Sequence, residues 1–147
     1  MDIQPKIING GLNIDERGET MFVNGFNFEG VKRFYVVSNH RQGFIRAWHA
    51  HKNAAKYALV ISGSALIGAV AIDNWENPNK NAQVHRFILS GKKPEVLYIP
   101  AGYANGAITL TENTKIIYFA TDTLEETKND DYRYPARYWD IWHIKER

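Results

Sequence analysis

The chain has 147 residues, a length that predicts one domain with a single core over residues 1–147. Its 18 basic and 16 acidic residues are spread along the chain, and the net charge of +2 gives no indication of nucleic-acid binding. Cysteine is absent, which excludes thiolate chemistry, iron–sulfur clusters and cysteine-ligated zinc. No run approaches roughly 18 apolar residues and the N-terminal residues do not resemble a signal peptide, so we expect no membrane association and a cytoplasmic location.

Short runs of β-branched and aromatic residues recur along the chain, and Gly, Asn, Asp and Pro separate them. The expected strands are residues 21–23, 33–37, 44–49, 57–61, 65–72, 84–89, 95–99, 107–110 and 115–120. This spacing predicts an all-β sandwich or barrel, and no long segment with a helical period competes with it. The polar residues 73–82 should form a loop. The aromatic residues 132–142 should form an arm that packs across the barrel mouth or against a partner subunit.

Residues 46–63 contain a His-x-His pair followed by a predicted strand. His49 and His51 would point to one face of a strand, because side chains two residues apart share a face. Trp48 would take the opposite face, in the core or in a subunit interface. Two imidazoles on one face often begin a metal site, and the alternative is a pair of partly buried histidines bonded to backbone groups. The pair alone leaves both interpretations open.

This stretch resembles the first motif of the cupins, in which glycines flank a His-x-His pair. Gly43, His49, His51 and Gly63 stand at the corresponding places. Residues 100–105 resemble the second cupin signature, a Pro-x-Gly-x-x-His turn. The resemblance implies an all-β, single-domain cupin jelly-roll barrel with a C-terminal aromatic arm.

Two positions depart from the metal-binding cupins. Lys56 stands where those proteins carry a glutamate, and Asn105 stands where they carry the last histidine. An ammonium group removes one ligand and, at 4 Å and an effective dielectric constant near 20, repels a cation by about 4 kcal/mol per unit of ion charge. We therefore predict that the site holds no metal.

A lysine beside histidines suits a different chemistry. A neutral imidazole can remove a proton from the carbon next to a ketone, and a fixed cation stabilises the resulting enolate. A positioned base accelerates such a step by about 10²–10⁴-fold, and one oriented charge contributes about 2.7–4 kcal/mol. The ammonium of Lys56 also favours the neutral form of nearby histidines. The residues fit proton abstraction better than ion binding.

Several segments together resemble the dTDP-4-dehydrorhamnose 3,5-epimerase-like cupins. The similar segments are residues 38–41, 46–51, 56–60, 99–110 and 116–122, and the tail 130–142. Each motif alone is weak, but five motifs in the right order over roughly residues 30–142 are fairly specific.

By this resemblance, His49 is the base, Lys56 neutralises the enolate and Arg46 helps to seat the substrate. The implied substrate is a nucleoside-diphosphate 4-keto-deoxy sugar, with no cofactor. The resemblance and the long aromatic arm also imply a homodimer.

The resemblance leaves the proton donor open. The family's acid tyrosine falls on Leu124 in this chain, and Tyr118, Tyr103 and His51 are the alternatives. The further candidates for substrate binding are Asn39, Arg41, Tyr103 and Asn105.

Two other functions fit parts of the sequence. Residues 46–52 are similar to the Arg-Gly-x-His-Ala-His-Lys motif of cupin-type sugar-nucleotide 3,4-ketoisomerases, in which both histidines move protons between adjacent carbons. Residues 100–105 lack the second motif of those enzymes and favour the epimerases. The leucine at position 124 favours a third reading, a sugar-nucleotide-binding cupin without turnover.

Overall fold

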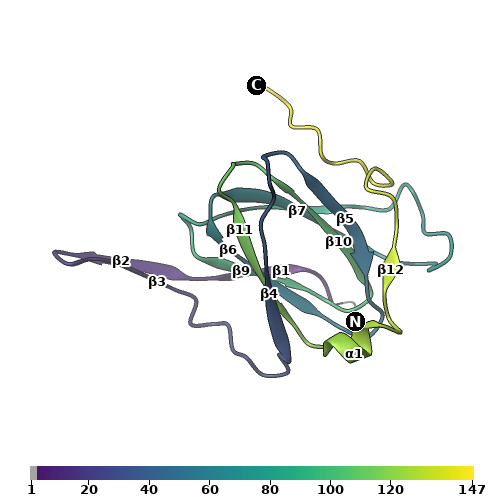
Figure 1. The fold of residues 1–147 in the computed structure, drawn as a ribbon, viewed down its shortest axis with the longest axis horizontal. Coiled ribbons are helices and arrows are strands. Elements are labelled where there is room, and N and C mark those ends of the chain that lie inside the picture. Colours follow the sequence, from purple (N-terminus) through teal and green to yellow (C-terminus); the bar gives the residue numbers. More distant parts are fainter. Residues whose placement is uncertain (1–2) are drawn as a thin grey trace.

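The computed structural model describes residues 3–147, and its regular secondary structure is almost entirely antiparallel strand (Figure 1). The first sheet has the order β1 (Lys6–Asn9), β9 (Glu95–Ile99), β6 (Lys56–Ser62), β11 (Lys115–Ala120) and β4 (Arg33–Val37). The second sheet has the order β12 (Tyr132–Arg133), β5 (Ile45–Ala50), β10 (Tyr103–Thr109), β7 (Ser64–Ala71) and β8 (His85–Ser90). Within residues 3–147 the two sheets do not join into one closed barrel. The all-β, jelly-roll prediction is confirmed.

Two further elements lie outside these sheets. Strands β2 (Gly11–Asp15) and β3 (Gly18–Phe22) form a separate hairpin, which extends away from the rest of the molecule in Figure 1. The helix α1 (Leu124–Thr127) begins with a capping box, in which Thr123 and Glu126 satisfy each other's backbone N–H groups.

The predicted strands agree with the structure over most of their length. The ranges 33–37, 95–99 and 115–120 coincide with β4, β9 and β11, and the polar residues 73–82 form a loop. Strand β10 begins at Tyr103, four residues before the expected start. Its missed residues include Asn105 and Gly106, and both residue types are uncommon in strands.

The core between the two sheets is built from inward-facing side chains of both sheets. Leu97 of β9, Ile67 of β7 and Ile116 of β11 are almost completely buried and come from both sheets. Sheet-on-sheet packing of this kind buries every second residue of a strand. Along β6 the same alternation buries Ala58 and Val60, and it places the first residue, Lys56, on the inner face with them. The fold therefore carries a cation into its interior.

A second core lies on the outer face of the second sheet. Trp48 is fully buried there, and the rings of Trp139 and Trp142 pack against it with centroid distances of 5.3 and 5.1 Å. The indole N–H groups of Trp48 and Trp142 both donate to the carbonyl of Ala136, at 3.1 and 2.7 Å. Of the two positions expected for Trp48, the core or a subunit interface, the structure shows the core.

This packing corrects the expected position of the arm. Residues 134–142 cover the outer face of the second sheet within the same chain, because Trp48 and its neighbours present an apolar surface there. Only the two-residue strand β12 reaches the edge of the sheet, where Tyr132 pairs with Ala50 and Arg133 with His49.

Two glycines occupy backbone conformations that other residues rarely adopt. Gly63 has a φ of 71° in the turn between β6 and β7, and Gly102 has a φ of 86° before β10. Glycine adopts positive φ values of this kind without a steric penalty, which explains the residue type at both positions. Separately, none of the helices in the described chain is long and apolar enough to cross a membrane.

Candidate active site

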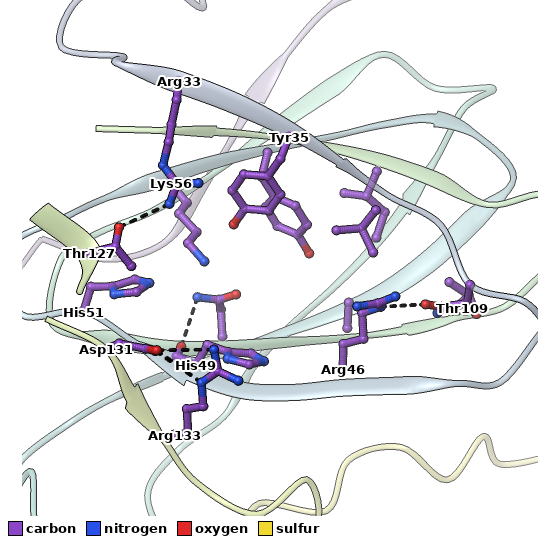
Figure 2. A pocket seen from close by; sticks show the side chains of 16 residues that line it. Arg33, Tyr35, Arg46, His49, His51, Lys56, Thr109, Thr127, Asp131 and Arg133 are labelled. Carbon is purple, nitrogen blue, oxygen red and sulfur yellow. Dashed lines mark hydrogen bonds and ion pairs between the residues drawn. The ribbon is translucent and has the colours of Figure 1, made fainter. Parts of the chain in front are cut away.

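A cavity of about 260 Å³ lies between the two sheets (Figure 2). Most of the site residues predicted from the sequence line this one cavity: Asn39, Arg46, His49, His51, Lys56, Asn105 and Tyr118. The spacing of the motifs therefore indicated residues that the fold brings together from four strands and from the segments that follow β4 and β5.

The cavity has two facing walls. Lys56 of β6, Tyr118 of β11 and Tyr35 of β4 belong to the first sheet and form what we name the first wall. His49 of β5 and Asn105 of β10 belong to the second sheet and form the second wall. Figure 2 shows Lys56 and Tyr35 on the opposite side of the cavity from His49. A flat molecule between the walls would meet different chemical groups on its two faces.

Lys56 is a buried cation at the centre of the first wall. Its side chain is 8% exposed, and its ammonium nitrogen lies 5.7 Å from the ring centroids of both Tyr35 and Tyr118. Within residues 3–147, no carboxylate forms an ion pair with it. Cation–π contacts with two rings help to hold a desolvated ammonium, but they leave its charge available to an anionic group in the cavity.

His49 is held as a neutral imidazole. Burial, together with the nearby cations Lys56 and Arg133, lowers the pKa of His49 to about 4, and the Asp131 carboxylate opposes this shift. At neutral pH the ring therefore carries no charge and can accept a proton. Asn105 lies opposite His49 in the β10–β5 pairing, and its side-chain N–H donates to the His49 carbonyl at 3.2 Å.

His51 is almost completely buried at the end of β5, and a hydrogen bond fixes its orientation. Its Nδ1 bonds to the backbone carbonyl of Asp130. A carbonyl oxygen can only accept, so Nδ1 carries the hydrogen, and in the neutral ring Nε2 is the basic nitrogen. The Asp130 carboxylate supports the same turn by accepting from the backbone N–H groups of Lys52 and Asn53, at 2.7 and 2.9 Å.

Tyr118 and Tyr35 form a stacked pair in the first wall. The two residues pair directly in the β11–β4 register, and their rings stack at 5.3 Å between centroids. Burial raises the pKa of Tyr118, which is only 6% exposed, whereas Tyr35 is half-buried on the edge strand. Sequence reasoning missed Tyr35. The alternation of Phe34 and Val36 with Arg33, Tyr35 and Val37 was the available signal, because it marks one inner face.

Arg46 is positioned at one end of the cavity by Asn39. The Arg46 Nε–H donates to the side-chain oxygen of Asn39 at 2.7 Å, and the Asn39 amide donates in turn to the Thr109 hydroxyl at 3.2 Å. This chain of hydrogen bonds fixes an exposed guanidinium beside the opening, where it can contact an anionic group.

The charge of the lining is strongly unbalanced. Four cationic side chains and a single carboxylate line the cavity: Arg33, Arg46, Lys56, Arg133 and Asp131. Such a lining favours an anionic ligand. Arg33, Arg133 and Asp131 were not predicted from the sequence. Arg133 lies in β12 and Asp131 directly precedes it, and a strand of two residues is too short to give a periodic signal.

Two predicted substrate-binding residues lie elsewhere. Tyr103 lines a different cavity together with His85, whose ring centroid is 6.0 Å away, because it stands at the opposite end of β10 from Thr109. Arg41 lies in an exposed loop, where its guanidinium stacks over Phe44 at 4.7 Å. Leu124, at the position of the family's acid tyrosine, is 65% exposed at the start of α1 and does not line the cavity.

The residues of the cavity do not form an obvious metal centre. Within the part of the chain that the structure describes, no group of three or more His, Cys, Asp or Glu side chains could hold a metal ion. Of the four cupin ligand positions, two carry histidines here, and the other two carry Lys56 and Asn105.

Known structures with this fold include both enzyme types considered above. The dTDP-4-dehydrorhamnose 3,5-epimerase of Bacillus anthracis is 20% identical, with a TM-score of 0.75 over 97% of this chain and 86% of that chain. The 3,5-epimerase of Legionella pneumophila, in complex with dTDP-4-keto-L-rhamnose, is 23% identical, with a TM-score of 0.73 over 93% and 77%. A 3,4-ketoisomerase of Helicobacter canadensis is 21% identical, with a TM-score of 0.68 over 96% and 98%.

Comparisons of sequence gave one negative and one positive result. No curated protein matches the chain closely enough to be considered a relative. The model of the dTDP-4-dehydrorhamnose 3,5-epimerase family, in contrast, matches residues 13–143, which is most of the chain. The protein therefore belongs to the dTDP-4-dehydrorhamnose 3,5-epimerase family.

Proposed function

We propose that the protein is a metal-independent epimerase that removes a proton next to the ketone of a nucleoside-diphosphate 4-keto-deoxy sugar. The observation that carries this proposal is a neutral imidazole, His49, on one wall of the cavity and a buried ammonium, Lys56, on the other. A base must be uncharged to accept a proton, and an enolate needs a positive charge near its oxygen. The cavity supplies both from facing walls.

The first step follows from these two groups. His49 takes the proton from the carbon, and the electron pair of the C–H bond moves to the ketone oxygen to give an enolate. Lys56 stabilises that oxygen, and one oriented charge in such a place contributes about 2.7–4 kcal/mol to the transition state. The negative charge of the enolate also increases the proton affinity of His49, so a base with a low pKa in the empty site becomes stronger as the reaction proceeds.

The charge and size of the cavity support the substrate class. Three arginines and Lys56 face one carboxylate in the lining, which favours a substrate with a diphosphate group. A volume of about 260 Å³ accommodates a sugar ring but leaves the nucleotide outside, along the open side of the cavity. We assign Arg46, at the opening and held by Asn39, to the seating of the substrate.

A second function is supported by His51. It stands two residues after His49, directly beyond the end of β5, and lines the same cavity. Its hydrogen bond to Asp130 leaves Nε2 as the basic nitrogen of the neutral ring. Two bases on one wall could move protons between adjacent carbons on one face of the sugar. That arrangement favours a 3,4-ketoisomerase as the alternative to an epimerase.

Deuterium incorporation from solvent tests the proposal. The wild-type protein is incubated in deuterated water with dTDP-4-keto-6-deoxy sugars, and NMR follows the carbons next to the ketone. We expect a deuterium label and an inverted centre with the wild type, and loss of both in H49Q. H85Q, which removes a histidine outside the cavity, is the matched control and should retain activity.

The other outcomes distinguish the alternatives. A product whose ketone has moved to the neighbouring carbon would identify a ketoisomerase and contradict the epimerase proposal. Tight binding of the sugar nucleotide with no label in any product would identify a binding protein without turnover.

We also propose that the protein forms a homodimer. The β2–β3 hairpin extends away from the two sheets in Figure 1, and its side chains Leu12, Ile14 and Met21 are exposed. Exposed apolar side chains on a protruding hairpin are typical of a surface that another chain covers. Sedimentation velocity should show a dimer for the wild type and a monomer for I14K. A wild-type monomer at micromolar concentration would contradict this proposal. The cytoplasmic location stays a prediction from the sequence.

A further inference from the structure

We propose that Tyr35 is the proton donor that completes inversion of the reacting carbon, an inference that rests on the proposed function. Inversion requires that a proton leave one face of the carbon and that another arrive on the opposite face. The enolate between these steps is planar, so base and acid must stand on opposite sides of it. The positions of the candidates in the two walls therefore decide which of them can invert the centre.

His51 stands on the wrong wall for this role. It directly follows the last residue of β5, two positions after His49, and its carbonyl accepts from the backbone N–H of Gly102 at 2.8 Å beside β10, so both side chains approach the sugar from the side of the second wall. A proton delivered by His51 would return to the face from which His49 removed one. Only the first wall, which carries Tyr35 and Tyr118, offers hydroxyl groups to the other face.

Burial and access separate the two tyrosines. Tyr118 lies on an inner strand of the first sheet, between β6 and β4, and it is only 6% exposed. Its raised pKa reflects that burial, which opposes formation of a phenolate. Tyr35 is half-buried on β4, the edge strand, so its hydroxyl can recover a proton from solvent after each turnover.

Two cations lie beside the Tyr35 ring. The Lys56 ammonium is 5.7 Å from the ring centroid, and the Arg33 guanidinium is 5.1 Å from it. Arg33 also forms an ion pair with Asp122 at 3.5 Å, so the Lys56 ammonium is the main charge that can stabilise the phenolate when Tyr35 has given up its proton. Stacking on Tyr118, with ring centroids 5.3 Å apart, holds the ring of Tyr35 in the wall. Tyr35 thus has a fixed position, a charge partner and access to water.

The step balances without any further reactant. The C–H bond breaks toward His49, and the enolate carbon then forms a new C–H bond with the proton of the Tyr35 hydroxyl. The phenolate regains a proton from water, and the His49 imidazolium releases its proton to water. No electron is gained or lost, and the product is an isomer of the substrate.

The variants Y35F and Y118F test this assignment, because phenylalanine keeps the stacked pair and removes only a hydroxyl. In deuterated water, Y35F should still exchange the hydrogen of the reacting carbon, since His49 can return a deuteron to the same face. Its rate of inversion should fall by about 10²–10⁴-fold, the usual contribution of a general acid. Y118F removes the other hydroxyl of the first wall and shows whether it takes part, and inversion should depend less on it than on Tyr35. Y98F, at a tyrosine that does not line this cavity, is the control that should retain both exchange and inversion. Thermal unfolding curves confirm that the variants are folded.

Each contrary outcome has a distinct meaning. Inversion by Y35F at the wild-type rate, or loss of inversion in Y118F alone, would overturn the assignment of Tyr35 and leave the proposed function standing. An absence of deuterium exchange in the wild type would overturn the proposed function itself. Exchange with movement of the ketone and no inverted centre would also overturn the assignment, because ketone transfer requires no donor on the first wall.

Discussion

Asn105 lies directly opposite His49 where β10 pairs with β5, and its side-chain amide donates to the His49 carbonyl at 3.2 Å. The amide thus supports the backbone of the strand that carries the base. Asn105 occupies the place of the last histidine of a metal-binding cupin, and Lys56 occupies the place of the glutamate. The four positions that supply the ligands in a metal-binding cupin therefore carry two histidines, an amide and an ammonium in this protein.

The first prediction is that restoring these two positions creates a metal site. The double variant K56E/N105H should bind one Ni²⁺ or Zn²⁺ ion per chain, because it presents three imidazoles and one carboxylate. The wild type should bind at least about 10²-fold more weakly, since the ammonium repels a cation by about 4 kcal/mol per unit charge at 4 Å. Isothermal titration calorimetry measures both affinities. Equally tight, stoichiometric binding by the wild type would show that Lys56 does not exclude the ion.

The second prediction concerns the aromatic arm. Trp142 is 3% exposed and packs on Trp48, so W142A should lower the free energy of unfolding by about 3–5 kcal/mol. Urea unfolding measures the change. H143A, which alters the exposed neighbouring residue, should stay within about 0.5 kcal/mol of the wild type. A loss of less than about 1 kcal/mol in W142A would mean that the arm is not an integral part of the second core.

The third prediction follows from the low pKa of His49. Its pKa is about 4 in the folded protein, against an ordinary value of 6.5, so between these pH values the unfolded chain binds a proton that the folded chain does not. The free energy of unfolding should therefore fall as the pH decreases through this window. The shift corresponds to about 3 kcal/mol, and the partial exposure of His49 reduces the expected loss to about 1–2 kcal/mol. Urea unfolding of the wild type and of H49Q at pH 7 and 4.5 isolates this contribution. An identical pH dependence in the two proteins would contradict it.

The features predicted correctly from the sequence are those that depend on the local pattern of residue types along a strand. Strands rich in β-branched residues, such as β4 and β11, were located to the residue, and the His-x-His spacing correctly placed His49 and His51 in one cavity. Strand β10 was shortened because Gly106 looks like a strand breaker. In the structure a glycine is required there, because a Cβ at that position would lie only 2.5 Å from the Cβ of Ala47.

What the sequence could not predict depends on contacts distant along the chain. Arg133 lines the cavity because two residues of the tail pair with β5. A strand of two residues is too short to produce a periodic pattern in the sequence. The arm covers the second sheet because Trp48 and Trp142 meet there, although 94 positions separate them in the numbering (142 minus 48). The alternation along β4 indicates that Tyr35 lies on the inner face of its sheet. Its proposed role as a proton donor also requires that this sheet face His49, which depends on the packing of the two sheets.

The central claim is that burial beside an ammonium keeps His49 neutral and ready to accept a proton. NMR titration of the His49 ring protons, assigned by comparison with H49Q, tests it most directly. We predict a pKa of about 4 in the wild type. In K56M the pKa should rise by roughly one unit, yet stay below 6.5 because burial persists. A wild-type pKa near 6.5, or a value that K56M leaves unchanged, would contradict the claim.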